Sequence, residues 1–325
     1  MRRLTFPLAI LIVAFAASSN AWAWLSTGHR IVAVIVWDEL TPAAKAKVTE
    51  ILKQHPRYAQ DLLADLPDAL PDESIQRFAV ASAATWPDMV RSLSNPMHAA
   101  YNHPSWHYID IPFAINGQVV PPPPPPREAS GPHNLVEALT AKAADLRDPA
   151  VSGPDKAIAL CWVLHLCGDI HQPLHAASFY SPQFPNGDQG GNGMIVLREP
   201  PYPDSRSNLH LVWDSLPGNF MSRDFEYYIA DGLRADPQYS REKLKDLLDV
   251  KDFAAWAQES HDLAVKYAYL NGQLVGLDSH AQITPDTQIP GLPRGYLKTA
   301  EGIAEQRIIL AGYRLADLLN SIFDK

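Results

Sequence analysis

The sequence is poor in cysteine, with only Cys161 and Cys167 among its 325 residues. Both fall in one predicted helix, where six residues of helical rise separate them by about 9 Å. A disulfide needs α-carbons closer than about 7 Å, so these two cysteines cannot pair. We therefore predict that both are buried apolar side chains and that the fold is stable without a disulfide.

Positive charge is also scarce, because 27 Lys and Arg side chains stand against 36 Asp and Glu side chains and leave a net charge of −9. A chain of this composition has no basic stripe with which to hold duplex DNA through its phosphates. If the protein acts on a polyanion, the positive charge has to come from another source. Bound divalent cations would supply it.

The N-terminus has the features of a targeting segment. Two arginines precede an apolar run at residues 6–17, and an A-x-A cleavage signal follows at residues 21–23. The run is too short to span a membrane. We predict that residues 1–23 are a signal peptide, that the protein is periplasmic or secreted, and that cleavage makes Trp24 the first residue of one domain at 24–325. No membrane span or obligate protein partner is indicated, and a monomer is expected.

Helical signals dominate the rest of the chain. Amphipathic periodicity and signals such as Thr41-Pro42 predict helices at residues 41–53, 72–85, 134–146, 154–170, 252–270 and 298–323. Short strands are predicted at residues 106–111, 194–198 and 208–213. Six prolines at 121–126 predict a polyproline II segment, and residues 187–192 predict a turn. The fold class is therefore a single, mainly α-helical domain with small β insertions and long loops.

Several motifs combine histidine with aspartate. His165 and Asp169 are four residues apart and share one helix face, His175 follows Pro173, and His210 and Asp214 repeat the four-residue spacing. One such pair alone is usually a surface pair or a satisfied core pair. Here, however, the first pair extends from an apolar helix in which unpaired polar groups would be costly, and a bound metal removes that cost. Nitrogen and carboxylate ligands without thiolates suit zinc, and manganese and iron are compatible with the same ligand types.

The new N-terminus offers a further set of ligands. After cleavage, the α-amine and the carbonyl of Trp24 could chelate a metal together with His29, five residues later. Processing would then create a ligand that the precursor lacks. The alternative is that Trp24 is only the first residue of an exported protein.

In these motifs and in their order, the chain resembles the zinc-dependent single-strand nucleases, the nuclease S-one and nuclease P-one family (type I nucleases). The resemblance extends over essentially the whole mature chain. The shared motifs are W-x3-GH, W-x-D-x2-R, H-[FY]-x-D, H-x3-D-x5-H with QPLH, D-x-GGN and NLH-x2-WD. It implies an α-helical domain of the phospholipase C and nuclease P-one type, and three bound zinc ions.

The resemblance also implies which residues hold the zinc ions. The first ion would be bound by Asp88, His107, His165 and Asp169, the second by His175, His210 and Asp214, and the third by the amine and carbonyl of Trp24, by His29 and by the other oxygen of Asp169. Leu25 stands where the family usually has glycine. His171 occupies a position that the family does not use for metal, and we expect it beside the ligands or at the surface.

The implied activity is hydrolysis of single-stranded DNA and RNA to 5′-phosphate products, with 3′-nucleotidase activity as an open addition. Zinc lowers the pKa of a bound water from about 15.7 to near 7, which would supply a nucleophile without a protein base. Asp88, Arg91 and Asp169 are the predicted catalytic residues, and Arg91 and Tyr108 are predicted to bind phosphate and base. The rival interpretations are a zinc-dependent phospholipase C and, more remotely, a non-catalytic exported zinc-binding protein.

Overall fold

The computed structural model describes residues 24–66, 70–115, 117–122, 130–198, 206–216, 218, 222–284 and 287–324. The predicted signal peptide and most of the proline run lie outside these residues. Within them, no helix is both long enough and apolar enough to cross a membrane.

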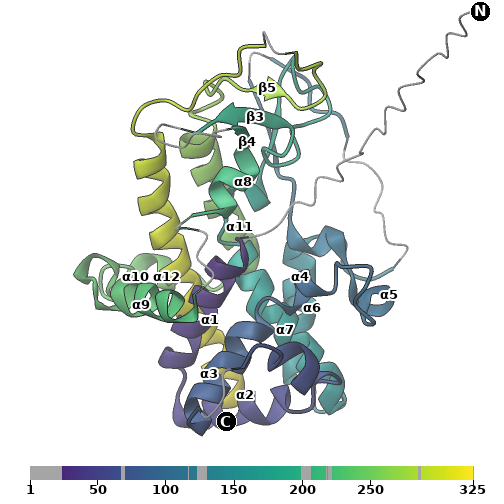
Figure 1. The fold of residues 1–325 in the computed structure, drawn as a ribbon, viewed down its shortest axis with the longest axis vertical. Helices are drawn as coiled ribbons and strands as arrows, with labels where there is room; N and C mark the ends of the chain where they lie inside the picture. Colours follow the sequence, from purple (N-terminus) through teal and green to yellow (C-terminus); the bar gives the residue numbers. More distant parts are fainter. Residues whose placement is uncertain are drawn as a thin grey trace, which may run out of the picture.

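Helices make up most of the described chain (Figure 1). The α-helices are α1 (Ser26–Glu39), α2 (Pro42–Leu52), α3 (Asp72–Ala83), α4 (Trp86–Met89), α5 (His98–Tyr101), α6 (Leu135–Arg147), α7 (Gly153–Asp169), α8 (Leu209–Asp214), α9 (Arg223–Ala235), α10 (Lys245–Leu248), α11 (Phe253–Leu263) and α12 (Tyr296–Phe323). Shorter 3-10 turns are η2 (Pro104–His107), η3 (Pro173–Ala176) and η4 (Pro237–Tyr239), and π-helical turns are η1 (Tyr58–Leu62) and η5 (Ala264–Ala268). The predicted fold class, mainly α with small β insertions, is confirmed.

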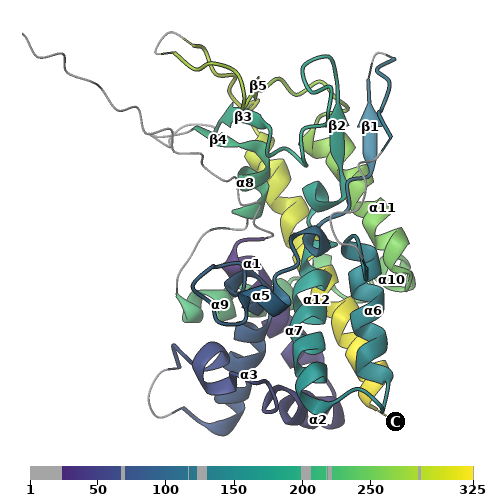
Figure 2. The ribbon, with the colours of Figure 1, turned by 90° about the vertical axis from the view of Figure 1, so that its right-hand side faces the viewer.

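The strands form two small sheets. Strand β1 (Pro112–Ala114) runs parallel to β2 (Ser178–Tyr180). Strand β3 (Met194–Leu197) lies between β4 (Arg206–Asn208) and β5 (Leu277–Asp278), antiparallel to both. Figure 2 shows both sheets at one end of the molecule, opposite the end formed by α2 and α3.

All six predicted helices are present, and local capping explains several of their boundaries. The Thr41 side chain accepts a hydrogen bond from the Ala44 amide at 3.1 Å, and Pro42 occupies the first turn of α2. Asn134 caps α6 in the same way, through the Glu137 amide at 3.0 Å. The helix predicted at 252–270 consists of α11 and the π-helical turn η5. The helices α1 and α9 were not predicted from the sequence.

Two of the three predicted strands are wrong. Residues 106–111 form the end of η2 and an extended link, and β1 begins only at Pro112. The backbone there pairs with η3 instead of a strand, because the Ile109 amide donates to the His175 carbonyl at 2.7 Å. Residues 208–213 belong mostly to helix α8, since the Asn208 side chain caps the Leu211 amide at 2.7 Å. The strand predicted at 194–198 is present as β3.

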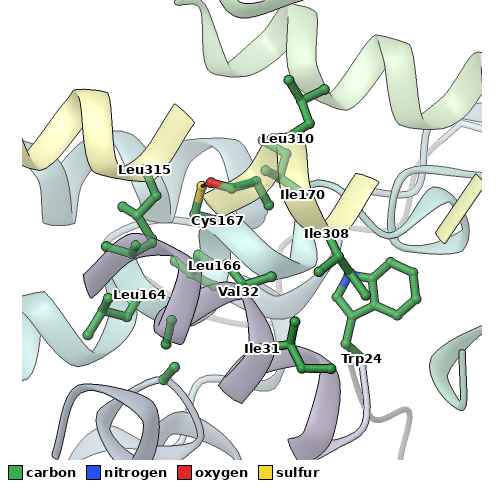
Figure 3. Packing of buried hydrophobic residues seen from close by; sticks show 14 of the residues in the cluster. Trp24, Ile31, Val32, Leu164, Leu166, Cys167, Ile170, Ile308, Leu310 and Leu315 are labelled. Atoms are coloured by element: carbon green, nitrogen blue, oxygen red, sulfur yellow. Dashed lines mark hydrogen bonds between the residues drawn. The ribbon is translucent and has the colours of Figure 1, made fainter. Parts of the chain in front are cut away.

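Helix α7 lies at the centre of the core. It packs against α1, α2, α4, α6 and α12, and its residues 157–169 are all buried. Figure 3 shows part of this core, where Leu166 of α7 lies beside Val32 of α1 and Leu310 of α12 belongs to the same cluster. Cys161 and Cys167 are free and buried, as predicted. The helix that carries His165 and Asp169 is therefore surrounded by protein on all sides.

Close packing of α1 against α12 depends on Gly312. A β-carbon at this position would lie 2.4 Å from Cγ2 of Ile35, so Gly312→Ala should force α1 and α12 apart. We expect a loss of about 1–3 kcal/mol in the free energy of unfolding, measured by urea denaturation. The control on the same helix is Gly302→Ala, which meets no atom within 4 Å and should stabilise by up to about 1 kcal/mol. Equal effects of the two substitutions would contradict the α1–α12 packing.

Candidate metal centre

Three groups of buried His and Asp side chains could each hold a metal ion. They consist of His29, His165 and Asp169; of Asp88, His107 and His165; and of His175, His210 and Asp214. Within each group, the nitrogen and oxygen atoms that could bind an ion all lie within 4.8 Å of one another. Eight of the nine residues predicted as ligands therefore lie in these groups, and the ninth is Trp24.

Asp169 connects the first two groups. Its Oδ2 lies 3.2 Å from Nε2 of His165 and 3.2 Å from Nδ1 of His107, whereas its Oδ1 lies 3.3 Å from Nε2 of His29. The two oxygens of one carboxylate thus face different imidazoles. Asp88 lies on the Oδ2 side, with its Oδ1 4.0 Å from the same two nitrogens of His107 and His165. This arrangement allows Asp169 to bind two ions at once.

The third group combines η3 with helix α8. His210 and Asp214 are one turn apart on α8, with Nε2 and Oδ2 separated by 3.3 Å, and Nε2 of His175 lies 3.7 Å from Oδ1 of Asp214. The rings of His175 and His210 are stacked with their centroids 4.9 Å apart. Nδ1 of His175 also lies 3.8 Å from Oδ1 of Asp169, so the third group adjoins the other two.

Backbone carbonyls fix three of the imidazole rings. Nδ1 of His165 donates to the Ala84 carbonyl at 2.7 Å, Nδ1 of His175 to the His107 carbonyl at 2.6 Å, and Nδ1 of His210 to the Gly190 carbonyl at 2.6 Å. Because a carbonyl only accepts hydrogen bonds, Nδ1 of each ring must carry the proton. In the neutral form of each ring, Nε2 then keeps its lone pair, as required of a metal ligand.

Several ligand atoms are buried and have no hydrogen-bond partner. They include Nε2 of His29 and of His175, both carboxylate oxygens of Asp169, and Oδ2 of Asp214. Leaving so many buried polar atoms unsatisfied costs free energy, and lone pairs that converge in this way repel one another. Divalent cations would satisfy all of them, so the residues present fit a metal centre.

The protonation states of the first two groups also suit a metal. Burial lowers the pKa of His107 to about 4 and lowers the pKa of His29 as well. Burial by itself would raise the pKa of Asp169, but the charge of His165 and the neighbouring rings of His107 and His29 hold it well below its usual range. Burial would also lower the pKa of His165, but the charges of Asp169 and Asp88 outweigh this effect and raise it. The neutral imidazoles of His29 and His107 and the ionised carboxylate are the forms that bind cations, whereas an ion bound by His165 has to compete with a proton.

His175, like His165, has a raised pKa. Burial would lower its pKa, but its contact with Asp214 and the charges of Asp169 and Asp214 outweigh this effect and raise it to about 9. An ion that binds to the third group therefore has to displace a proton from His175 at neutral pH.

Gln172, which belongs to the QPLH motif but received no role in the sequence analysis, supports the third group. Its Nε2 donates to Oδ1 of Asp214 at 2.6 Å, and its Oε1 accepts the Leu174 amide at 2.6 Å. The side chain is fully buried. Gln172 thus links the carboxylate on α8 to the turn that carries His175.

Two glycines let backbone and imidazoles come close together. A β-carbon at Gly168 would lie 2.7 Å from Nδ1 of His29, and a β-carbon at Gly190 would lie 2.5 Å from the Leu174 carbonyl. Gly190 also has a φ of 63°, in the left-handed region that glycine readily adopts. The D-x-GGN motif therefore serves to place the carbonyl that orients His210.

Trp24 is buried beside the same centre. Its indole Nε1 donates to the Gly168 carbonyl at 3.1 Å, and the amide of Leu25 donates to the Asp214 carbonyl at 2.9 Å. Residue 24 is thus anchored both to the neighbour of Asp169 and to a residue of the third group. Coordination by its α-amine stays a prediction.

The predicted substrate-binding residues adjoin two of the ligands. Nη1 of Arg91 lies 3.4 Å from Oδ1 of Asp88, with 17% of the Arg91 side chain exposed. Tyr108 follows His107 and is half-buried, and its carbonyl accepts the Leu135 amide at 3.0 Å. Both roles stay predictions.

His171 is not at the surface. It is fully buried, Nδ1 donates to the Cys167 carbonyl at 2.7 Å, and Nε2 accepts a hydrogen bond from Arg314 at 3.0 Å. Of the two placements expected from the sequence, the surface one is wrong, because His171 follows directly on the buried end of α7.

Comparison with known proteins identifies one matching family and several similar proteins. A family model described as S1/P1 Nuclease matches residues 24–324. Endonuclease 1 of Arabidopsis thaliana is 27% identical over 99% of this chain and 93% of its own length, and Endonuclease 5 of the same plant is 27% identical over 82% of this chain and 85% of its own. Nuclease S1 of Aspergillus oryzae is 27% identical over 53% of this chain and 56% of its own.

Removing bound cations should destabilise the fold. Chelation would leave the converging atoms around Asp169 unsatisfied in the core, so we expect the melting temperature to fall by about 5–10 °C. Calorimetry with EDTA, and with EDTA saturated beforehand with zinc as the control, measures the change. An unaltered melting curve after elemental analysis has verified metal loss would contradict the arrangement described.

Proposed function

Because the chain belongs to the S1/P1 nuclease family, we propose that it is an exported endonuclease that binds three zinc ions and hydrolyses single-stranded DNA and RNA to 5′-phosphate products. The observation that carries the proposal is the carboxylate of Asp169. Its two oxygens are buried, face different imidazoles and have no hydrogen-bond partner. A carboxylate in this setting is suited to bridging two cations.

The proposed ligands divide among the three ions as the groups suggest. Asp88, His107 and His165 would hold the first ion with Asp169, and the third group would hold the second. His29, the other oxygen of Asp169 and the N-terminus of Trp24 would hold the third. Nitrogen and carboxylate ligands without thiolates suit zinc, and nine ligand residues for three ions leave coordination positions open for a substrate.

The chain's own residues would position the substrate. Zinc bound in this centre would supply Lewis acidity and lower the pKa of a bound water to near 7. Arg91, held beside Asp88, can donate charge-assisted hydrogen bonds to the oxygens of a phosphodiester. Because its pKa is low, Asp169 stays ionised and provides a fixed negative charge at the end of α7.

Tyr108 would provide the preference for single strands. It directly follows His107, a proposed ligand of the first ion, so a base stacked on its ring would place the adjoining phosphate near Arg91 and Asp88. Stacking accepts any base, and a base held this way must first leave its own stack, which is easiest in a single strand. A net charge of −9 provides no competing basic surface for a duplex.

The test of this function uses protein that begins at Trp24. The protein is incubated with single-stranded DNA, RNA, duplex DNA and phosphatidylcholine, and its zinc is measured by elemental analysis. We expect rapid cleavage of the two single-stranded substrates, 5′-phosphate ends and three zinc ions per chain. Faster hydrolysis of phosphatidylcholine than of any nucleic acid would replace the nuclease by a phospholipase C, and no hydrolysis by zinc-loaded protein would leave only a zinc-binding role.

Substitution of Tyr108 tests the stacking role. Tyr108→Ala should lose roughly 1–3 kcal/mol of stacking, which weakens cleavage of single-stranded DNA about 5- to 150-fold. Hydrolysis of a methyl phosphodiester, which has no base, should change much less. Tyr228→Ala, at a tyrosine that is 71% exposed on α9, is the matched control. Unchanged hydrolysis of single-stranded DNA by Tyr108→Ala would show that the stacking role is wrong.

Blocking the N-terminus tests the third ion. Protein with one additional residue ahead of Trp24 has no free α-amine there, although the indole contact with Gly168 is unaffected. We expect this form to bind one zinc ion fewer and to lose most of its activity, as measured by elemental analysis and single-stranded DNA hydrolysis. Equal zinc content and equal activity in the two forms would rule out the amine as a ligand.

A further inference from the structure

Two arginines of the C-terminal helix lie in the core. Arg307 and Arg314 are seven residues apart on one face of α12, and each exposes only 1% of its surface. Burial lowers the pKa of Arg307 to about 10, which leaves its guanidinium charged at neutral pH. Buried charges are costly unless they are paired and hydrogen-bonded, so the partners of these two arginines explain why the fold retains them.

Glu259 of α11 is the carboxylate that both arginines share. Oε2 of Glu259 accepts hydrogen bonds from Nη1 of Arg307 at 2.9 Å and from Nη1 of Arg314 at 2.8 Å, and Oε1 accepts another from Nη2 of Arg314 at 2.8 Å. The guanidinium of Arg314 also lies over the Trp256 ring, 4.8 Å from its centroid. The two arginines thus join α11 firmly to α12.

Most of the remaining donors reach the end of α7, and Nη2 of Arg314 also donates to the Leu247 carbonyl of α10 at 2.6 Å. Nε of Arg307 donates to the His171 carbonyl at 3.2 Å, Nη1 of Arg314 donates to Nε2 of His171 at 3.0 Å, and Nδ1 of His171 donates to the Cys167 carbonyl at 2.7 Å. Ser260, which accepts from Arg307 at 2.9 Å, donates to the Ile170 carbonyl at 2.5 Å. The Cys167 carbonyl belongs to the last turn of α7, and the Ile170 and His171 carbonyls follow directly after it. A helix leaves acceptors unsatisfied at this end and favours positive charge there.

This turn lies between two parts of the metal centre. Asp169, which joins the first two groups, ends α7, and His175 of the third group follows in η3. The segment 170–174 therefore determines how Asp169 and His175 lie relative to each other, with Oδ1 of Asp169 now 3.8 Å from Nδ1 of His175.

We propose that the arginine clamp, formed by Arg307, Arg314, Glu259, Ser260 and His171, is a positioning device that holds segment 170–174 so that Asp169 and His175 can bind neighbouring ions. The clamp touches no proposed ligand side chain, and it acts through the backbone carbonyls on both sides of Asp169. The proposal rests on the proposed function, because it requires the groups to bind zinc.

The test substitutes Arg314 and measures metal binding in the full mature chain. Arg314→Met removes the hydrogen bonds to His171, Glu259 and the Leu247 carbonyl but keeps an aliphatic chain beside Trp256. The matched control is Arg241→Met. Like Arg314, Arg241 pairs with a carboxylate, here Asp317 of α12 at 3.0 Å, and lies over an aromatic ring, here Tyr313 with its centroid at 4.4 Å. It has no hydrogen bond to residues 167–175 among the described contacts.

We expect Arg314→Met to bind at least one zinc ion about 10- to 100-fold more weakly, the range typical for residues that orient ligands. The visible spectrum of the cobalt-substituted protein should also change, because its bands report ligand geometry. Arg241→Met should keep the zinc affinity and the cobalt spectrum of the wild type. If Arg314→Met does not fold, Glu259→Gln takes its place. This substitution weakens the ion pairs that Glu259 forms with both arginines without changing the side-chain volume, and it should show the same changes to a smaller extent.

A lowered melting temperature in Arg314→Met and in Glu259→Gln, with unchanged zinc affinity and cobalt spectrum, would overturn the proposal and leave the clamp a purely structural network. If the wild type itself binds no zinc, the proposed function fails and the clamp has no ions to position. The two failures are distinguishable because the second appears already in the wild type.

Discussion

An ionised carboxylate in an apolar core is the constraint on which the rest of this structure depends. Asp169 ends a helix whose residues 157–169 are all buried, and its two oxygens have no hydrogen-bond partner. Such a group is tolerated only if positive charge surrounds it. The surrounding elements supply side chains that could hold cations beside it. His29 comes from α1, Asp88 from α4, His107 from η2 and His175 from η3. The centre is therefore part of the core, and the folding of α1 and α7 against each other also assembles the site.

Precision in this centre comes largely from the main chain. Carbonyls of Ala84, His107 and Gly190 hold three imidazoles, and the absence of a side chain at Gly168 and Gly190 allows the necessary close approach. Main-chain groups are suited to this task because the packed helices and turns keep them fixed. The arginine clamp also acts through the main chain. Its hydrogen bonds end on carbonyls next to Asp169, so the ligand side chains stay available to bind ions.

The charge of the whole chain fits this design. With a net charge of −9, the protein offers little general attraction for a polyanion, so the force that draws a phosphate to the site has to be local. Cations bound in the groups around Asp169, together with the partly exposed Arg91, would concentrate positive charge where the substrate would react. With the proposed function, binding would then depend on an accessible phosphodiester and a free base, and hardly on sequence.

The sequence by itself determined the fold class and the six predicted helices, and its motifs identified the eight His and Asp side chains that gather in the core. Local rules suffice for these features: Thr41 with Pro42 and the apolar period set helix boundaries, and the spacing of His165 and Asp169 puts both on one helix face. Tertiary structure decided the rest. Alternating apolar residues at 208–213 resemble a strand, but the Asn208 cap and packing make them a helix. His165 takes part in two groups because helices distant in sequence converge on it. In the sequence, Arg307 and Arg314 are polar positions on an amphipathic helix. Packing against α11 and the end of α7 buries them. The sequence of one element does not reveal this, because burial depends on which elements pack together.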